Sequence, residues 1–184
     1  NAIKKTETYQ ATYSQVTSDE DIKQLLDMIK TAGKASFVVE ENQKEKTLSV
    51  AISLAAGQNY CIEKIDYDNT GKNFIEILKT FCADTSIKKY CHDAKTIMRI
   101  LHNYQLTLNG LAFDTMLAAY LLNPGYAGPD LDNLVLQHLN IILPRQGIES
   151  LAAKAESILK LYNLLNENLE KNDLADLYYN VELP

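Results

Sequence analysis

One short stretch of the sequence, residues 111–122, constrains the fold more than any other. It begins with an apolar run, residues 111–113, that is too short for a helix and typical of a buried strand. Asp114 follows where a helix N-cap belongs, because its carboxylate can accept hydrogen bonds from the free amides of a first turn. Residues 116–122 are apolar on nearly every side, and Pro124 cannot continue a helix. The stretch predicts a buried strand that leads directly into a helix covered all round.

The composition limits the classes of function. The chain has 184 residues, of which 46% are hydrophobic and 23% charged, as in an ordinary soluble globular domain. No apolar run reaches the roughly 18 residues that a membrane span needs, so we expect no membrane partner. The net charge is −6 and only Arg99 and Arg145 are arginines, which disfavours a stand-alone nucleic-acid binder, because such binders neutralise phosphates with basic side chains.

The ends of the chain suggest a piece of a longer protein. Residues 1–11 are polar and without period, so we expect a tail or linker there and one domain over residues 12–184. The chain does not begin with Met, and its start has no apolar signal-peptide core. Cys61, Cys82 and Cys91 form no C-x-x-C pair, which fits buried, reduced thiols in the cytosol.

The remaining pattern predicts an α/β domain. A short extended segment is expected at 12–16, and strands are expected at 35–41, 47–54, 60–62, 86–91 and 111–113. Helices are expected at 19–32, 73–81, 93–103, 116–122, 131–139, 151–169 and 173–179. The first three strands follow one another through short turns, which favours an antiparallel meander. Helices separate the later strands, which favours parallel pairing. The expected architecture is a mixed sheet of about five strands with helices on both faces.

Five short motifs resemble one known family. They are I-L-x-N-Y at 100–104, G-x-A-F-D-T-M-L at 110–117, Y-x-L-N at 120–123, D-x-D-x-L at 130–134 and E-x-P at 182–184. In this order they resemble the 3′–5′ exonuclease domain of bacterial DNA polymerase I, a family A polymerase, as found in its Klenow-type fragment. The resemblance covers nearly the whole chain and implies a ribonuclease H-like fold, cut at the junction to a polymerase domain.

The resemblance also implies a catalytic site, in which four carboxylates hold two metal ions that activate water and stabilise the leaving oxygen. The family's first motif, D-x-E on the first strand, falls on Val39 and Glu41. Neighbouring strand residues point to opposite faces, so Glu40 and Glu41 cannot chelate one ion together. Either both glutamates are polar residues that leave a buried strand, or Glu41 is a remnant of the site.

The second motif of the family, N-x-x-x-D, falls on Asp93 and Ile97 when counted back without gaps from residues 100–104. Ile97 cannot bind a metal ion. Asp93 is either a remnant of the site or, more simply, a cap on the first turn of the helix.

The third motif, Y-x-x-x-D, falls on Leu151 and Ala155, and another reading frame offers Tyr162 and Asn166. Neither frame supplies a carboxylate. The literal Y-x-x-x-D at 126–130 precedes the late helix by many residues, so we interpret it as chance. Only Glu41 and Asp93 therefore remain as candidate remnants among the positions of the three motifs.

No other catalytic pattern replaces these motifs. His92, His102 and His138 have no partner spacing, and there is no H-x-x-x-H, G-x-G-x-x-G or serine nucleophile elbow. The sequence has 11 tyrosines, which can form a stacking groove for single strands, but no arginine cluster accompanies them.

We therefore predict a catalytically inactive, structural 3′–5′ exonuclease-like domain without metal or cofactor of its own. The resemblance implies a polymerase domain of the same parent chain as its partner, Mg²⁺ for that polymerase, DNA contact through the parent protein, and a bacterial cytoplasmic, nucleoid-associated location. One alternative is an active metal-dependent exonuclease with displaced ligands, drawn from Glu40, Glu41, Asp93 and Asp114. Another alternative is a DNA-contacting module without catalysis.

Overall fold

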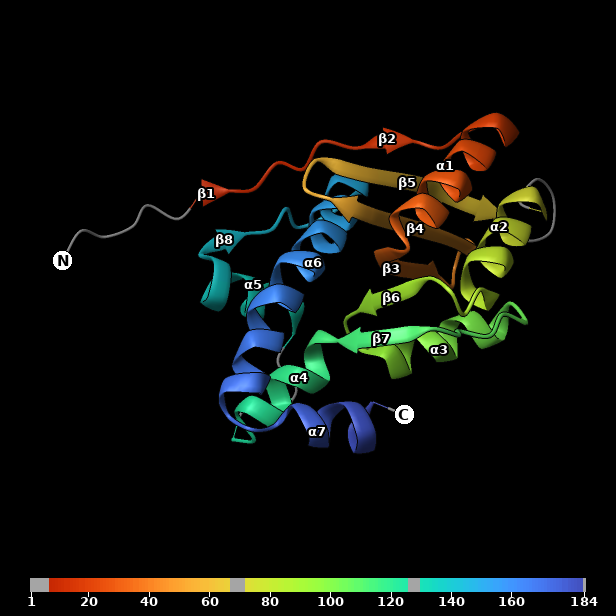
Figure 1. The fold of residues 1–184 in the computed structure, drawn as a ribbon. Helices are drawn as coiled ribbons and strands as arrows, with labels where there is room; N and C mark the ends of the chain where they lie inside the picture. The colour runs from red at the N-terminus through yellow and green to blue at the C-terminus, as the bar shows by residue number, and fades with distance from the viewer. Residues whose placement is uncertain (1–6, 67–71, 126–129, 184) are drawn as a thin grey trace.

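The structure is a computed structural model that describes residues 7–66, 72–125 and 130–183 (Figure 1). The strands of the main sheet are β2 (Ser14–Gln15), β3 (Lys34–Asn42), β4 (Thr47–Ala55), β5 (Gln58–Asp66), β6 (Lys88–Cys91) and β7 (Leu111–Asp114), and a second sheet consists of β1 (Glu7–Thr8) and β8 (Ile141–Ile142). The helices are α1 (Asp19–Ala32), α2 (Lys72–Ala83), α3 (Ala94–Asn103), α4 (Thr115–Leu122), α5 (Leu131–Leu139), α6 (Ile148–Lys171) and α7 (Ala175–Leu177), followed by a π-helical turn, η1 (Tyr178–Glu182).

The main sheet is mixed, in the order β2-β5-β4-β3-β6-β7. Strands β3, β4 and β5 form an antiparallel meander, and β6 and β7 then add in parallel, which confirms the predicted arrangement. The sheet also contains β2, which pairs in parallel with the outer edge of β5. The sequence predicts a short extended segment over residues 12–16, and β2 lies within it. A strand of two residues has too little periodicity to indicate its pairing partner.

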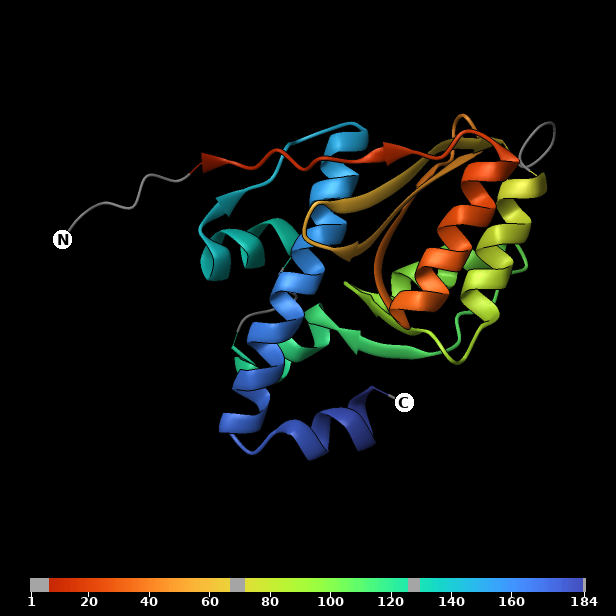
Figure 2. The same ribbon diagram turned by 45° about the horizontal axis from the view of Figure 1, so that its top comes forward.

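Two helical layers cover the two faces of the sheet (Figures 1 and 2). Helices α1, α2 and α3 form one apolar core with the sheet, and α4, α5 and α6 form a second core with its other face. Side chains of β3 alternate between the two cores, as strand geometry requires. Phe37 and Val39 face the first core, whereas Val38 packs in the second core and Ser36 donates to a carbonyl of α6.

Local signals at several chain positions agree with the structure. Ser18 caps α1 in a capping box with Asp21, and Gly33 ends the helix in the left-handed region at φ 65°. The three cysteines are free and buried.

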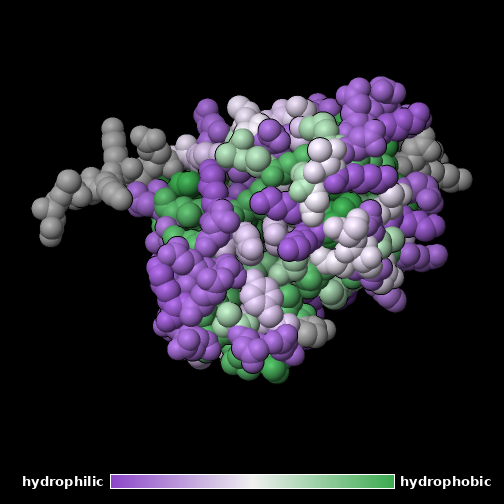
Figure 3. Space-filling model, viewed as in Figure 1, coloured by the Kyte–Doolittle hydropathy of each residue, from purple (hydrophilic) through white to green (hydrophobic). Residues whose placement is uncertain are grey.

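The face of the molecule in Figure 3 carries mostly hydrophilic side chains, with hydrophobic ones in small patches between them. Within the described part of the chain, no helix is long and apolar enough to cross a bilayer.

The sequence predicts a tail or linker over residues 1–11, but the described part of this segment contacts elements that lie much later in the chain. Residues 1–6 lie outside the described residues, but β1 pairs in parallel with β8, and Tyr9 N donates to Ile142 O at 2.9 Å. The Tyr9 hydroxyl donates to the buried carboxylate of Glu156 on α6, and Ala11 is 9% exposed. The segment is ordered by partners distant in sequence, which a local pattern cannot reveal.

Helix α4 is also less buried than predicted. Ala118 and Ala119 are buried, but Tyr120 is 47% exposed. The expectation of a helix covered all round is wrong, because α4 follows β7, the last strand of the sheet, and packs mainly on one side, against α6. A uniformly apolar helix therefore does not have to be a central one. The Y-x-x-x-D at 126–130 begins at Tyr126, which lies outside the described residues.

Candidate functional site

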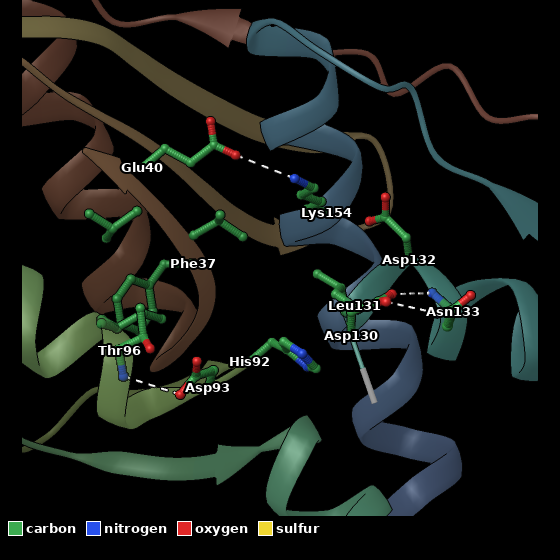
Figure 4. Close-up of a pocket in the computed structure, with 13 residues that line it drawn as sticks. Phe37, Glu40, His92, Asp93, Thr96, Asp130, Leu131, Asp132, Asn133 and Lys154 are labelled. Carbon is green, nitrogen blue, oxygen red and sulfur yellow. Dashed lines mark hydrogen bonds and ion pairs between the residues drawn. The ribbon is translucent and has the colours of Figure 1, made fainter. Parts of the chain in front are cut away.

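A cleft of about 530 Å³ opens between β3, the start of α3, the start of α5 and α6 (Figure 4). Its lining residues are Phe37, Val38, Val39, Glu40, His92, Asp93, Thr96, Ile97, Asp130, Leu131, Asp132, Asn133 and Lys154. The residues from β3 form an apolar wall that ends at Glu40, and acidic side chains come from the starts of the two helices. This cleft contains several of the positions to which the sequence assigns the family's catalytic motifs.

On β3, the structure brings Glu40 to the α6 side and not Glu41. The Glu40 carboxylate lies 3.3 Å from the ammonium of Lys154 on α6 (Figure 4). Glu41 points to the opposite face, where burial first and then the Glu41 carboxylate raise the pKa of Tyr104 to about 12. The strand positions that face α6 are Val38 and Glu40, one residue before the expected Val39 and Glu41. Val39 still borders the cleft, although it packs in the α1–α3 core.

At α3, the structure brings both expected positions to the cleft. Asp93 is the N-cap of α3, with φ 59°, and its carboxylate accepts from Thr96 N at 3.1 Å. Ile97 is 5% exposed and packs in the α1–α3 core. Asp93 therefore has the capping role that its position in the sequence favours, and Ile97 offers only hydrocarbon to the cleft.

On α6, the side chain that enters the cleft is Lys154, which the sequence reasoning missed. The expected positions Leu151 and Ala155 are 3% and 0% exposed and pack in the α4–α6 core. The Ala155 carbonyl accepts from Ser36 Oγ at 2.5 Å, so this side of α6 lies directly on the sheet. A signal for Lys154 exists, because it is the one charged residue within the small and apolar run 151–155.

The alternative frame on α6 is structural. Tyr162 stacks on Tyr90 with ring centroids 4.4 Å apart, and Asn166 accepts from the Tyr179 hydroxyl at 2.5 Å. These contacts join α6 to β6 and to the C-terminal turn. Neither residue lines the cleft.

Asp114, at the end of β7, is 5% exposed, and its carboxylate serves two helix starts. Oδ1 accepts from Met116 N at 2.9 Å and from Leu117 N at 3.4 Å, which confirms the predicted N-cap of α4. The same carboxylate accepts from Asp93 N at 3.0 Å and from Ala94 N at 2.7 Å at the start of α3. Its oxygens are thus directed at backbone amides and not at the cleft.

His92 lies beside the two helix starts without a catalytic partner. Its Nδ1 is 2.9 Å from the hydroxyl oxygen of Thr115. Burial lowers the pKa of His92, and the nearby carboxylates, Asp114 first, offset this lowering only in part. The ring is therefore neutral at pH 7 and adds no positive charge to the cleft.

The residues of the cleft do not fit the pair of metal ions that the family resemblance implies. Such a pair needs several carboxylates that converge on it. Among residues 7–66, 72–125 and 130–183, no three His, Cys, Asp or Glu side chains come together in a way that could hold a metal ion. The Glu40 carboxylate is paired with an ammonium, and the carboxylate of Asp130 caps α5 through Asn133 N at 2.7 Å. The alternative of an active exonuclease with displaced ligands also lacks a converging set of carboxylates, because Glu40 and Glu41 lie on opposite faces of β3.

Comparison with protein families gives one matching model, described as DNA polymerase I, ribonuclease H-like domain, over residues 35–142. Among curated proteins, DNA polymerase I of Bacillus subtilis is 26% identical over 198 residues, which covers 95% of this chain and 22% of that protein. DNA polymerase I of Chloroflexus aurantiacus is 32% identical over 133 residues, covering 60% of this chain and 14% of that protein. The chain thus spans about a fifth or less of these relatives.

Solved structures agree on the fold. The POL domain of Pol1 from M. smegmatis, in complex with DNA primer-template and dNTP, superposes with a TM-score of 0.78 at 26% identity, covering 93% of this chain and 30% of that one. Brucella melitensis NrnC gives a TM-score of 0.66 at 16% identity, covering 93% of this chain and 86% of that one. Trypanosoma brucei RNase D gives 0.66 at 14% identity, covering 94% and 67%. These last two likenesses concern the fold alone, which is the predicted ribonuclease H-like arrangement.

Proposed function

Because the chain belongs to the family of DNA polymerase I ribonuclease H-like domains, we propose that it is a catalytically inactive 3′–5′ exonuclease-like domain. Its role in this proposal is structural: it is a module of a DNA-directed DNA polymerase that acts in replication and repair. In this proposal the chain keeps the ribonuclease H-like fold of the family but lacks the family's exonuclease chemistry.

The observation that carries the proposal is the chemistry of the cleft. The two-metal site that the family resemblance implies takes its carboxylates from β3, from α3 and from α6. The side chains here are Val38 and Glu40 on β3, Ile97 on α3 and Lys154 on α6. One carboxylate, Glu40, faces the late helix, and its partner there is an ammonium 3.3 Å away. Such a set does not supply the converging carboxylate ligands that two divalent ions need.

The partners follow from the relatives. These are DNA polymerases I, of which the chain spans about a fifth or less, so the proposed partner is the polymerase domain of the same parent chain, with Mg²⁺ at that domain's own site. DNA is contacted through the parent protein, in the bacterial cytoplasm at the nucleoid. The net charge of −6 supports weak or no DNA binding by this domain itself.

A nuclease assay tests the proposal. The chain is incubated with single-stranded DNA labelled at its 5′ end, with Mg²⁺ or Mn²⁺, beside matched Glu40→Gln and Glu41→Ala variants. The expected result is no stepwise 3′ shortening above the level of the variants. Metal-dependent shortening that either substitution abolishes would show a working exonuclease and refute the proposed function.

A further inference from the structure

The position of Lys154 is the least expected feature of the cleft. Its side chain is 23% exposed, compared with 65% for Lys171, which forms an ordinary surface pair with Glu167 on the same helix. The ammonium of Lys154 reaches across from α6 to Glu40 on β3, so the pair joins two elements on opposite sides of the cleft (Figure 4). The aliphatic part of the side chain belongs to the wall of the cleft.

The surroundings of this ammonium are acidic. Of the described residues that line the cleft, four are carboxylates, namely Glu40, Asp93, Asp130 and Asp132, whereas Lys154 is the single lysine and no arginine is present. The carboxylates of Asp93 and Asp130 accept hydrogen bonds from backbone amides in the first turns of α3 and α5. A concave surface with this excess of negative charge concentrates cations from solution, and divalent ions most of all.

We propose that the ammonium of Lys154 is the counter-ion of the Glu40 carboxylate and that it prevents divalent ions from binding in the cleft. The ammonium acts in two ways. It takes up a Glu40 oxygen that a metal ion would need as a ligand, and it repels any divalent ion that approaches the other carboxylates. The inference rests on the proposed function, because it explains how an acidic cleft disfavours the divalent ions that exonuclease chemistry needs.

The test is a titration of the chain with Mn²⁺ alone, in which electron paramagnetic resonance reports the free ion. Lys154→Met removes the charge and keeps the aliphatic length, and Lys154→Gln is a second variant in case the first does not fold. Either variant is expected to bind Mn²⁺ about tenfold or more tightly than the unchanged chain, since removing a unit charge a few ångströms from the ion is worth that factor or more.

Two further variants make the result specific. Lys171→Gln removes one lysine from a pair on the same helix but outside the cleft, and it is expected to leave Mn²⁺ affinity unchanged. Adding Glu40→Gln to Lys154→Met is expected to abolish the gain. Equal affinities for Lys154→Met and Lys171→Gln would overturn the inference, as would a gain that survives Glu40→Gln. Failure of the proposed function has a different signature, because it requires DNA hydrolysis by the unchanged chain.

Discussion

Replacing Asp114 by alanine is expected to destabilise the domain by about 4–5 kcal/mol. The carboxylate accepts three short hydrogen bonds from backbone amides, at 2.7, 2.9 and 3.0 Å, and one long one at 3.4 Å. Hydrogen bonds to a charged group are worth about 1.5–3 kcal/mol each, and the residue is 5% exposed, so little water can replace them. Three bonds at the low end of that range give the expected loss, which is a large share of a typical total of about 5–15 kcal/mol.

Urea denaturation, followed by circular dichroism, measures this free energy of unfolding. Asp114→Asn keeps one side-chain acceptor and loses the charge, so it is expected to cost about half as much as Asp114→Ala. Asp130→Ala is the matched control, because Asp130 is exposed and, within the described residues, its carboxylate bonds only to Asn133 at the start of α5. Its loss is expected to cost about 1 kcal/mol. Similar losses for Asp114→Ala and Asp130→Ala would refute the view that Asp114 joins two helix starts.

Three further predictions concern stability and DNA. Hydrogen bonds to Glu156, from Asn59 first, outweigh its burial and lower its pKa from 4.5 to about 2, so stability present above pH 4.5 is lost as the pH falls toward 2. Urea titrations across that range are expected to show a loss of about 3 kcal/mol that is missing from Glu156→Gln. Tyr178→Phe is expected to cost about 1–3 kcal/mol in the same assay, because the buried Asp114 N and O lose their hydroxyl partner; a cost near zero would contradict this. Fluorescence anisotropy with single-stranded DNA is expected to show weak or no binding, and a high affinity that falls steeply with salt would contradict that expectation.

The parts of the fold that the sequence predicts are those governed by short-range chemistry. Ser18 and Asp114 are visible as caps because their side chains bond to amides two or three residues away. The meander is visible because its strands follow one another through short turns. In contrast, the docking of Tyr9 on Glu156 joins residues 147 positions apart. No local pattern contains that pairing.

The candidate site was predictable as a location but not in its details. The motif frame led to β3, α3 and α6, which all line the cleft, but on β3 and α6 the side chains that meet across the cleft are one residue earlier than expected. Strand and helix faces change with every residue, so a displacement by one residue replaces Glu40 with Glu41 and Lys154 with Ala155. The Glu40–Lys154 pair is 114 residues apart in sequence, and its existence depends on how α6 lies on the sheet.

The most direct test of the central claim is a crystal of the chain soaked with Mn²⁺ and examined by anomalous scattering. The account predicts no Mn²⁺ in the cleft, with the Lys154 ammonium still beside Glu40. Two anomalous peaks about 4 Å apart, bound by Glu40 and Asp93, would be a two-metal site and would contradict the account.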